Sequence, residues 1–133
     1  MKIWRIENDD YRGIYHGILH IQTEINYLGI SSRHPAPLKD SMFAENAYDK
    51  GFDFVWSDDL QAYYYGFSSP EQLLNWFYNY DDLIRFEYAG FHVTVIESND
   101  VIEGNTQCAF CHVGCTRVQQ HSMCEFLDLY GKV

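Results

Sequence analysis

Alternating hydrophobic and polar residues predict β-strands in several stretches of the chain. Residues 2–7 (KIWRIE) change sides at every position, and 91–98 (FHVTVIES) alternates and is rich in β-branched residues. The turn-forming segments ENDDYRG and NDVIEGN follow these stretches, so we expect each strand to end there. Two further strands are expected, at 60–67 and 106–113.

A period of three to four residues predicts a helix near the amino end. Between residues 14 and 29, apolar side chains recur at steps of four and three, which places them on one face of a helix. The two prolines of 31–40 (SSRHPAPLKD) exclude regular structure there. One short helical turn is expected at 42–48.

Capping residues mark helices later in the chain. Ser69 is placed as an N-cap before Pro-Glu-Gln, and Gln72 completes a capping box. Ser122 and Glu125 form a second capping box near the carboxyl end. The stretch 80–90 (YDDLIRFEYAG) is expected to form a further helical segment that ends at its glycine.

The order of these elements predicts the fold class. Strands and helices are interspersed irregularly, with no internal repeat or linker. A length of 133 residues suits one domain with one core. We therefore expect a single α+β domain over residues 1–133, built on a twisted, mostly antiparallel sheet with two or three helices.

The formal charge of −10 narrows the range of partners. Such acidity disfavours direct nucleic-acid binding and suits a protein with a basic surface, although acidic charge also serves solubility. No apolar run reaches the roughly 20 residues that span a bilayer, and the charged start lacks the apolar core of a signal peptide. We therefore expect a cytoplasmic protein with reduced thiols and no membrane association.

Three aspartate pairs, 9–10, 58–59 and 81–82, lie beside aromatic residues. Their ordinary interpretation is solvated charge in loops and helix starts. If they share a face with exposed tyrosines, that face would suit the docking of a basic protein.

All four cysteines lie within residues 108–124 (CAFCHVGCTRVQQHSMC). By residue type, Cys108, Cys111, His121 and Cys124 would make a tetrahedral zinc site. Alternation along the expected strand, however, sends Cys108 and Cys111 to opposite faces, and free cysteine often packs as a small hydrophobe. We therefore favour buried thiols without a metal, and zinc binding is the alternative.

Five residues are candidates for contacting a ligand or partner: Arg5, His16, Arg33, His34 and Asp40. The last three lie on the proline-stiffened loop, which loses little entropy on binding, and the fork of Arg5 suits a phosphate. The alternatives are structural. Asp40 would cap the turn that follows, and Arg5 and His16 would face solvent.

Four motifs in order resemble a group of small phage and prophage proteins. They are WRIEN, RHPAPLKD, YGFSSPEQLLNWF and GFHVTVIES with DVIEGNTQCAF, and they cover most of residues 1–110. The resemblance implies a phage accessory protein, and small acidic phage proteins are often antagonists of host defence. The favoured hypothesis is thus a non-enzymatic protein that antagonises a host defence process by binding a host protein or a small nucleotide signal.

A second resemblance is to the ADP-ribosyltransferase fold. IYHG at 14–17 is similar to the motif that holds the nicotinamide ribose, and YYYGFSSPEQLL is similar to a strand-to-helix segment with a serine at the junction. As an alternative, this implies a minimal or degenerate NAD-dependent transferase with His16, Ser68 and Glu97 as catalytic residues. Glu97 lacks the Glu-x-Glu context usual in that fold. A small zinc-stabilised interaction module built on 108–124 is the third alternative.

Overall fold

The computed structural model describes residues 1–13, 40–50 and 63–131, and the helix expected at 14–29 lies outside this range. Within the described part the chain forms six strands and four helices. In chain order these are β1 (Lys2–Glu7), α2 (Ser41–Asp49), β2 (Tyr63–Gly66), α3 (Pro70–Trp76), α4 (Tyr80–Tyr88), β3 (His92–Glu97), β4 (Val101–Glu103), β5 (Cys108–Cys111), β6 (Thr116–His121) and α5 (Met123–Tyr130).

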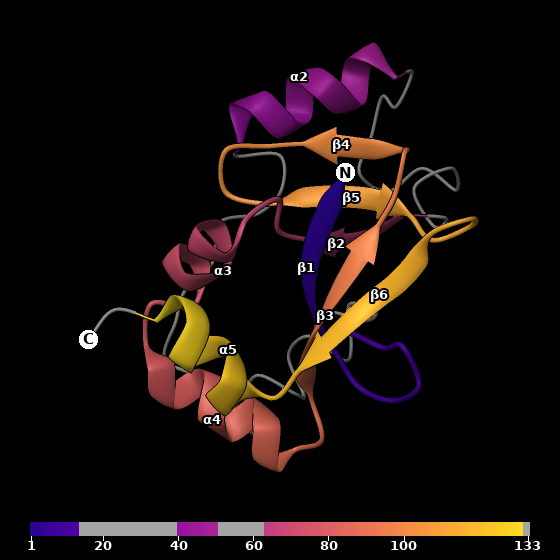
Figure 1. Ribbon diagram of the computed structural model, residues 1–133. Coiled ribbons are helices and arrows are strands. Elements are labelled where there is room, and N and C mark those ends of the chain that lie inside the picture. The colour runs from indigo at the N-terminus through magenta and orange to yellow at the C-terminus, as the bar shows by residue number, and fades with distance from the viewer. Residues whose placement is uncertain (14–39, 51–62, 132–133) are drawn as a thin grey trace.

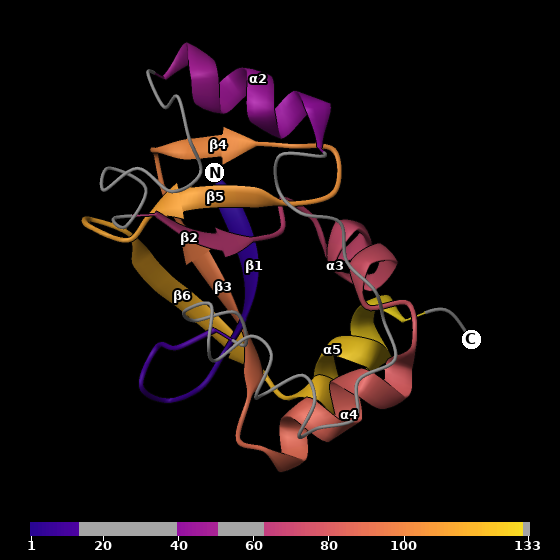
Figure 2. The same cartoon turned by 180° about the vertical axis from the view of Figure 1, so that it is seen from behind.

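The strands form two antiparallel sheets of three strands each. The first sheet has the order β1-β3-β6 and the second the order β2-β5-β4. Figure 1 shows the second sheet lying across one end of the first, and α2 covering its outer side. Helices α3, α4 and α5 gather on one side of the first sheet, and the loop after β1 lies on the other side (Figure 2).

Three apolar clusters fill the spaces between these layers. The first lies between the first sheet and the three helices and includes Ile6, Leu73, Leu83, Phe86, Val93, Met123 and Phe126. The second lies between the two sheets and contains Ile3, Ile96, Cys108 and Phe110. The third lies between the second sheet and α2 and contains Phe43, Ala47, Ile102 and Ala109. The second sheet thus covers only the Ile3 end of one face of the first sheet.

Local capping signals explain where two helices begin. Asp40 is the N-cap of α2, and its side chain accepts a hydrogen bond from Phe43 N at 3.1 Å. At α5 the expected capping box between Ser122 and Glu125 is confirmed, because each side chain bonds the backbone N–H of the other residue.

The start of α3 differs in one respect from the expected capping box. Ser69 Oγ accepts a hydrogen bond from Gln72 N at 3.0 Å, as expected. The Gln72 side chain instead accepts from Ser68 N at 2.9 Å and donates to Gly104 O and Asn105 O, each at 3.1 Å. Gln72 therefore ties α3 to the connection between β4 and β5, a tertiary contact that the local sequence pattern does not contain.

The α+β class expected from the sequence is confirmed, but the details differ. Two small sheets stand where one was expected, and the described residues hold four helices rather than two or three. The expected link at 99–105 contains the short strand β4, and β6 was not predicted at all. Most side chains of β6 are exposed, so its sequence lacks the apolar alternation that marks a strand.

Candidate functional site

One face of the first sheet is polar at the end that the second sheet leaves open. Residues paired across neighbouring strands lie on the same face of a sheet. The rows on this face are Glu7–His92, Arg5–Thr94–Gln120 and Ile3–Ile96–Arg117. Because Ile3 and Ile96 pack under the second sheet, the remaining side chains form a polar surface.

A β-bulge in β6 brings Arg117 to this polar face. The register with β3 shifts between Gln119 and Arg117, so Val118 is an extra residue without a partner in the ladder. Regular alternation would send Arg117 and Gln120, three positions apart, to opposite faces. Bulges often re-aim a side chain beside a functional site, and here the bulge unites Arg117 and Gln120 on one face.

Glu7 is fully buried on this face and is bound by two arginines. Arg117 donates two hydrogen bonds to it, Nε to Oε1 at 2.6 Å and Nη2 to Oε2 at 3.0 Å. Arg5 donates a third from Nε to Oε2 at 3.1 Å, and its Nη1 donates to Tyr65 O. The guanidinium of Arg5 also lies over the Tyr64 ring. Two positive charges and one negative charge leave this cluster with one net positive charge.

The pKa values of the cluster follow from this geometry. Burial by itself would raise the pKa of Glu7, but the hydrogen bonds from Arg117 and the charges of both arginines outweigh it, so the pKa lies below its usual value. The hydrogen bond to Glu7 raises the pKa of Arg117, whereas burial lowers the pKa of Arg5 against the opposing charge of Glu7. Glu7 and Arg117 are therefore charged at neutral pH. Arg5 is charged as well, because the guanidinium of arginine keeps its proton in proteins.

The loop after β1 places an aromatic ring on Arg117. Asn8 Oδ1 accepts hydrogen bonds from Asp10 N and Arg12 N, each at 3.0 Å, which closes the loop. Tyr11 has a φ of 64°, a left-handed conformation that is uncommon for a bulky residue. Its ring centroid lies 3.9 Å from Arg117 Cζ, close enough for a cation–π contact.

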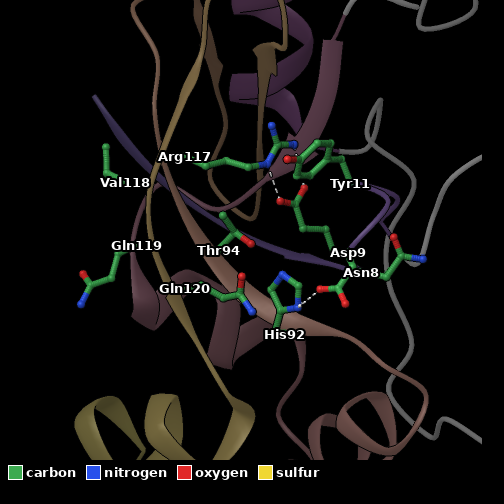
Figure 3. A pocket seen from close by; sticks show the side chains of 10 residues that line it. Asn8, Asp9, Tyr11, His92, Thr94, Arg117, Val118, Gln119 and Gln120 are labelled. Atoms are coloured by element: carbon green, nitrogen blue, oxygen red, sulfur yellow. Dashed lines mark hydrogen bonds and ion pairs between the residues drawn. The ribbon is translucent and has the colours of Figure 1, made fainter.

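These elements surround a cavity of about 390 Å³, which we call the Arg117 cavity (Figure 3). Its lining is polar and comes from the loop after β1, from β3 and from β6, and it includes Asp9, Tyr11, His92, Thr94, Arg117 and Gln120. His92 Nδ1 lies 3.8 Å from Asp9 Oδ1 at the rim. Figure 3 shows Gln120 turned towards His92, whereas the side chain of Gln119 points away from the group. This volume suits a small ligand.

Arg5 does not face solvent, so that alternative for it is wrong. The residue is 6% exposed, and Glu7 and Tyr65 O accept hydrogen bonds from its guanidinium. Arg5 is not part of the cavity lining. It contributes to the site by binding Glu7, which in turn orients Arg117.

Asp40 has the structural role that the sequence offered as an alternative. Its carboxylate accepts hydrogen bonds from the backbone of Phe43, Asn105 and Thr106 and from the Thr106 hydroxyl. Burial would raise the pKa of Asp40, but these hydrogen bonds hold it below its usual value. Asp40 therefore caps α2 and ties that helix to the connection between β4 and β5.

Three predicted site residues lie outside the described residues: His16, Arg33 and His34. The two other transferase candidates are separate from the Arg117 cavity. Ser68 is bonded to Gln72 Oε1 at the start of α3, and the exposed Glu97 pairs with the amino-terminal NH₃⁺ at 3.3 Å.

The structure does not bring the four zinc candidates together. Cys108 is fully buried between the sheets, and Cys111 lies on the opposite face of β5, as alternation predicted. His121 is buried at the end of β6. Cys124 is exposed at the start of α5 and contacts Glu87 of α4. Within residues 1–13, 40–50 and 63–131, no three His, Cys, Asp or Glu side chains lie close enough to hold a metal ion.

The aspartate pairs differ from one another in burial. Asp9 and Asp10 are exposed, the pair 58–59 lies outside the described residues, and Asp82 is fully buried beside the exposed Asp81. On α4 the exposed residues Asp81, Arg85 and Tyr88 recur at helical spacing, so this face mixes both charges with an aromatic ring. The docking of a basic host protein stays a prediction.

Sequence reasoning missed most of the cavity: Glu7, Tyr11, His92, Arg117 and Gln120. One signal was present, because Arg5 and Glu7 stand two positions apart in an expected strand and so share a face. Nothing local indicates the bulge or the approach of β6, since the bond between Glu7 and Arg117 joins residues 110 positions apart.

Comparison with known proteins gives one result. The family model described as Bacteriophage T4 Y00F protein matches residues 1–124, a range that contains every residue lining the Arg117 cavity. No curated protein and no solved structure matches the chain. In the part of the chain that the structure describes, no helix has the length and apolar character needed to cross a membrane.

Proposed function

The chain belongs to the Bacteriophage T4 Y00F protein family, and on that premise we propose that it is a phage accessory protein that acts by binding. It antagonises a host defence process, in the host cytoplasm, by sequestering a small nucleotide in the Arg117 cavity. The match to a phage family supports the accessory role, and the cavity supports a small ligand as the target.

The observation that carries this proposal is the way Glu7 orients Arg117. Glu7 accepts hydrogen bonds from Nε and Nη2 of Arg117, and no partner for Nη1 is found among the described residues. The guanidinium is thus fixed on one edge and retains donors for an incoming group. An arginine oriented in this way favours phosphate or carboxylate recognition.

The same geometry favours binding over catalysis. Glu7 is bonded on both oxygens and its lowered pKa keeps it ionised at neutral pH. It therefore has no proton to donate, and its lone pairs are engaged. The NAD-dependent transferase and the zinc-stabilised module stay predictions.

The test is a nucleotide panel added to the purified full chain. Cyclic nucleotides and nucleoside mono-, di- and triphosphates of the common bases are screened by thermal unfolding and then by calorimetry. A bound nucleotide at about 100 times its Kd should stabilise the folded state by about 2.7 kcal/mol. Mass spectrometry should recover the ligand chemically unchanged.

A conservative pair of variants assigns the binding to the cavity. Arg117→Lys keeps a positive charge beside Glu7 but loses the planar fork, so we expect affinity to fall by about tenfold or more. The matched control is Arg12→Lys, because Arg12 is exposed and outside the cavity lining. Conversion of a nucleotide to product, or the absence of binding by every nucleotide up to about 1 mM, would overturn the proposal.

A further inference from the structure

The charge of the Arg117 cavity limits the charge of its ligand. The buried cluster of Arg5, Glu7 and Arg117 carries one net positive charge, as counted above, in a chain whose total is −10. Asp9 adds a negative charge at the rim, where its side chain is 94% exposed and screened by water. The site can therefore neutralise about one negative charge, and a polyphosphate would leave most of its charge unpaired in an acidic protein.

Tyr11 offers a second, aromatic contact beside the charged one. The ring has one face against Arg117, and the residue remains 57% exposed. Its positive φ costs of order 1–3 kcal/mol, so the loop maintains a strained residue in order to present this ring. Exposed aromatic rings of this kind stack nucleobases with little dependence on the base.

Polar side chains complete the pocket between these two contacts. Gln120 and Thr94 stand in one cross-strand row, and His92 is next to them on β3. Amide, hydroxyl and imidazole groups hydrogen-bond polar atoms without adding a fixed charge. They suit the sugar and the base edge of a nucleotide.

From this arrangement we infer that the Arg117 cavity takes a nucleotide with a single negative charge, such as a phosphodiester. The phosphate lies against the Arg117 guanidinium, and the base stacks on the open face of Tyr11. This inference rests on the proposed nucleotide-binding function and narrows it to one charge class.

The experiment is a charge series on one base, measured by calorimetry with the full chain. The ligands are adenosine, adenosine 3′,5′-cyclic monophosphate, AMP and ATP, and the series is repeated with guanine, cytosine and uracil. For the base that binds best, the cyclic monophosphate should bind about tenfold more tightly than either the nucleoside or the triphosphate.

Two variants test the contacts without removing a buried charge. Tyr11→Gly removes the ring and relieves the positive φ, so stability should stay equal or rise while affinity falls by about tenfold. Its matched control is Tyr88→Ala, which removes a ring that is 89% exposed outside the cavity.

Gln120→Glu places a negative charge in the cavity and should abolish binding of the cyclic monophosphate. Gln119→Glu adds the same charge at a residue that also borders the cavity but whose side chain points away from it, so this variant should reduce affinity far less (Figure 3).

The outcomes separate this inference from the function on which it rests. If AMP or the triphosphate binds most tightly, or the nucleoside binds as tightly as the cyclic monophosphate, the single-charge inference is wrong and the nucleotide-binding proposal stands. If no member of any series binds, both are wrong. If Tyr11→Gly and Tyr88→Ala leave affinity equally unchanged, the assigned place of the base is wrong.

Discussion

At the scale of single residues, Glu7 determines how Arg117 is oriented. Its carboxylate has no solvent contact, and removing such a group from water costs several kcal/mol. Three hydrogen bonds from two guanidinium groups offset that cost. Glu7 is the central member of the network, because its loss leaves the buried Arg5 without an opposing charge, whereas the loss of either arginine leaves Glu7 paired with the other.

We therefore expect Glu7→Gln to lower the free energy of unfolding by about 3–5 kcal/mol. The substitution keeps the size of the side chain but leaves Arg5 buried without an opposing charge. Urea denaturation at neutral pH measures the loss. The matched control is Glu97→Gln, whose carboxylate lies in an exposed pair with the amino terminus and should contribute less than about 1 kcal/mol. Equal losses for the two variants would contradict the network.

Asp40 predicts a pH dependence of stability. Its pKa in the folded protein lies below the usual value of 3.8. The stability that its carboxylate provides is therefore complete above that pH and is lost as the pH falls through the folded pKa. Asp40→Asn should lower the free energy of unfolding by about 2 kcal/mol at neutral pH, and the difference in this free energy between the variant and the unaltered protein should shrink below about pH 4. Denaturation at several pH values measures this. Asp49→Asn, on an exposed residue of the same helix, should show no such trend, and a constant deficit for Asp40→Asn down to about pH 2 would contradict the assignment.

The two kinds of residue differ in how far the sequence predicts them. Asp40 and Ser122 were predictable as caps because a cap and its partner lie within about four positions. The role of Gln72 was only half predictable, since its side chain bonds a distant connection. Glu7 and Arg117 were not predictable as a pair, because their contact forms only when β1 and β6 flank β3 in one sheet.

At the scale of elements, the bulge in β6 decides which face of the sheet Arg117 occupies. Strands that bury alternate side chains were recognisable from their apolar pattern, as in β1 and β3. β6 exposes most of its residues at a sheet edge and has no such pattern. The element that supplies Arg117 and Gln120 is therefore the one that sequence periodicity could not indicate.

Deleting Val118 should keep Arg117 and Gln120 on one face. Without the extra residue the two side chains stand two positions apart, so regular pairing with β3 leaves both on the polar face of the first sheet. We therefore expect Glu7 to keep Arg117 as a partner, and the free energy of unfolding, measured by urea denaturation, should fall by less than the about 3–5 kcal/mol expected when a buried charge loses its partner. The matched control is Val118→Ala, which keeps the residue count at a position that is 52% exposed and should change stability by less than about 0.5 kcal/mol. A loss of about 3–5 kcal/mol in the deletion variant alone would show that the local shape of the bulge, and not only the choice of face, positions Arg117 against Glu7.

At the scale of the whole molecule, the crossing of the two sheets creates the open polar face. Trp4 and Phe67 join the sheets through two backbone hydrogen bonds of 2.8 Å. Beside them, a Cβ on Gly66 would lie 2.5 Å from Ile3 Cγ2, so only glycine permits this close approach. The sequence predicted the α+β class because that class depends on the types of element. It did not predict two sheets, because their separation depends on this long-range crossing.

The layered core also predicts how the cysteines react with a thiol reagent. Cys108 is buried between the two sheets, and burial raises the pKa of its thiol, so it should react only after unfolding. Cys124 is exposed and should react first, although its hydrogen bond to Glu87 raises the pKa of that thiol. Peptide mass spectrometry after timed labelling of the native protein identifies the order in which the thiols react, and Cys124→Ser should remove the fastest step. Fast labelling of Cys108 in the folded protein would mean that β5 does not lie between two covered layers.

The same arrangement predicts that a metal chelator leaves the unfolding midpoint unchanged, because Cys108, Cys111, His121 and Cys124 do not converge. Unfolding of the protein by a chelator would restore the zinc-stabilised module as the better hypothesis.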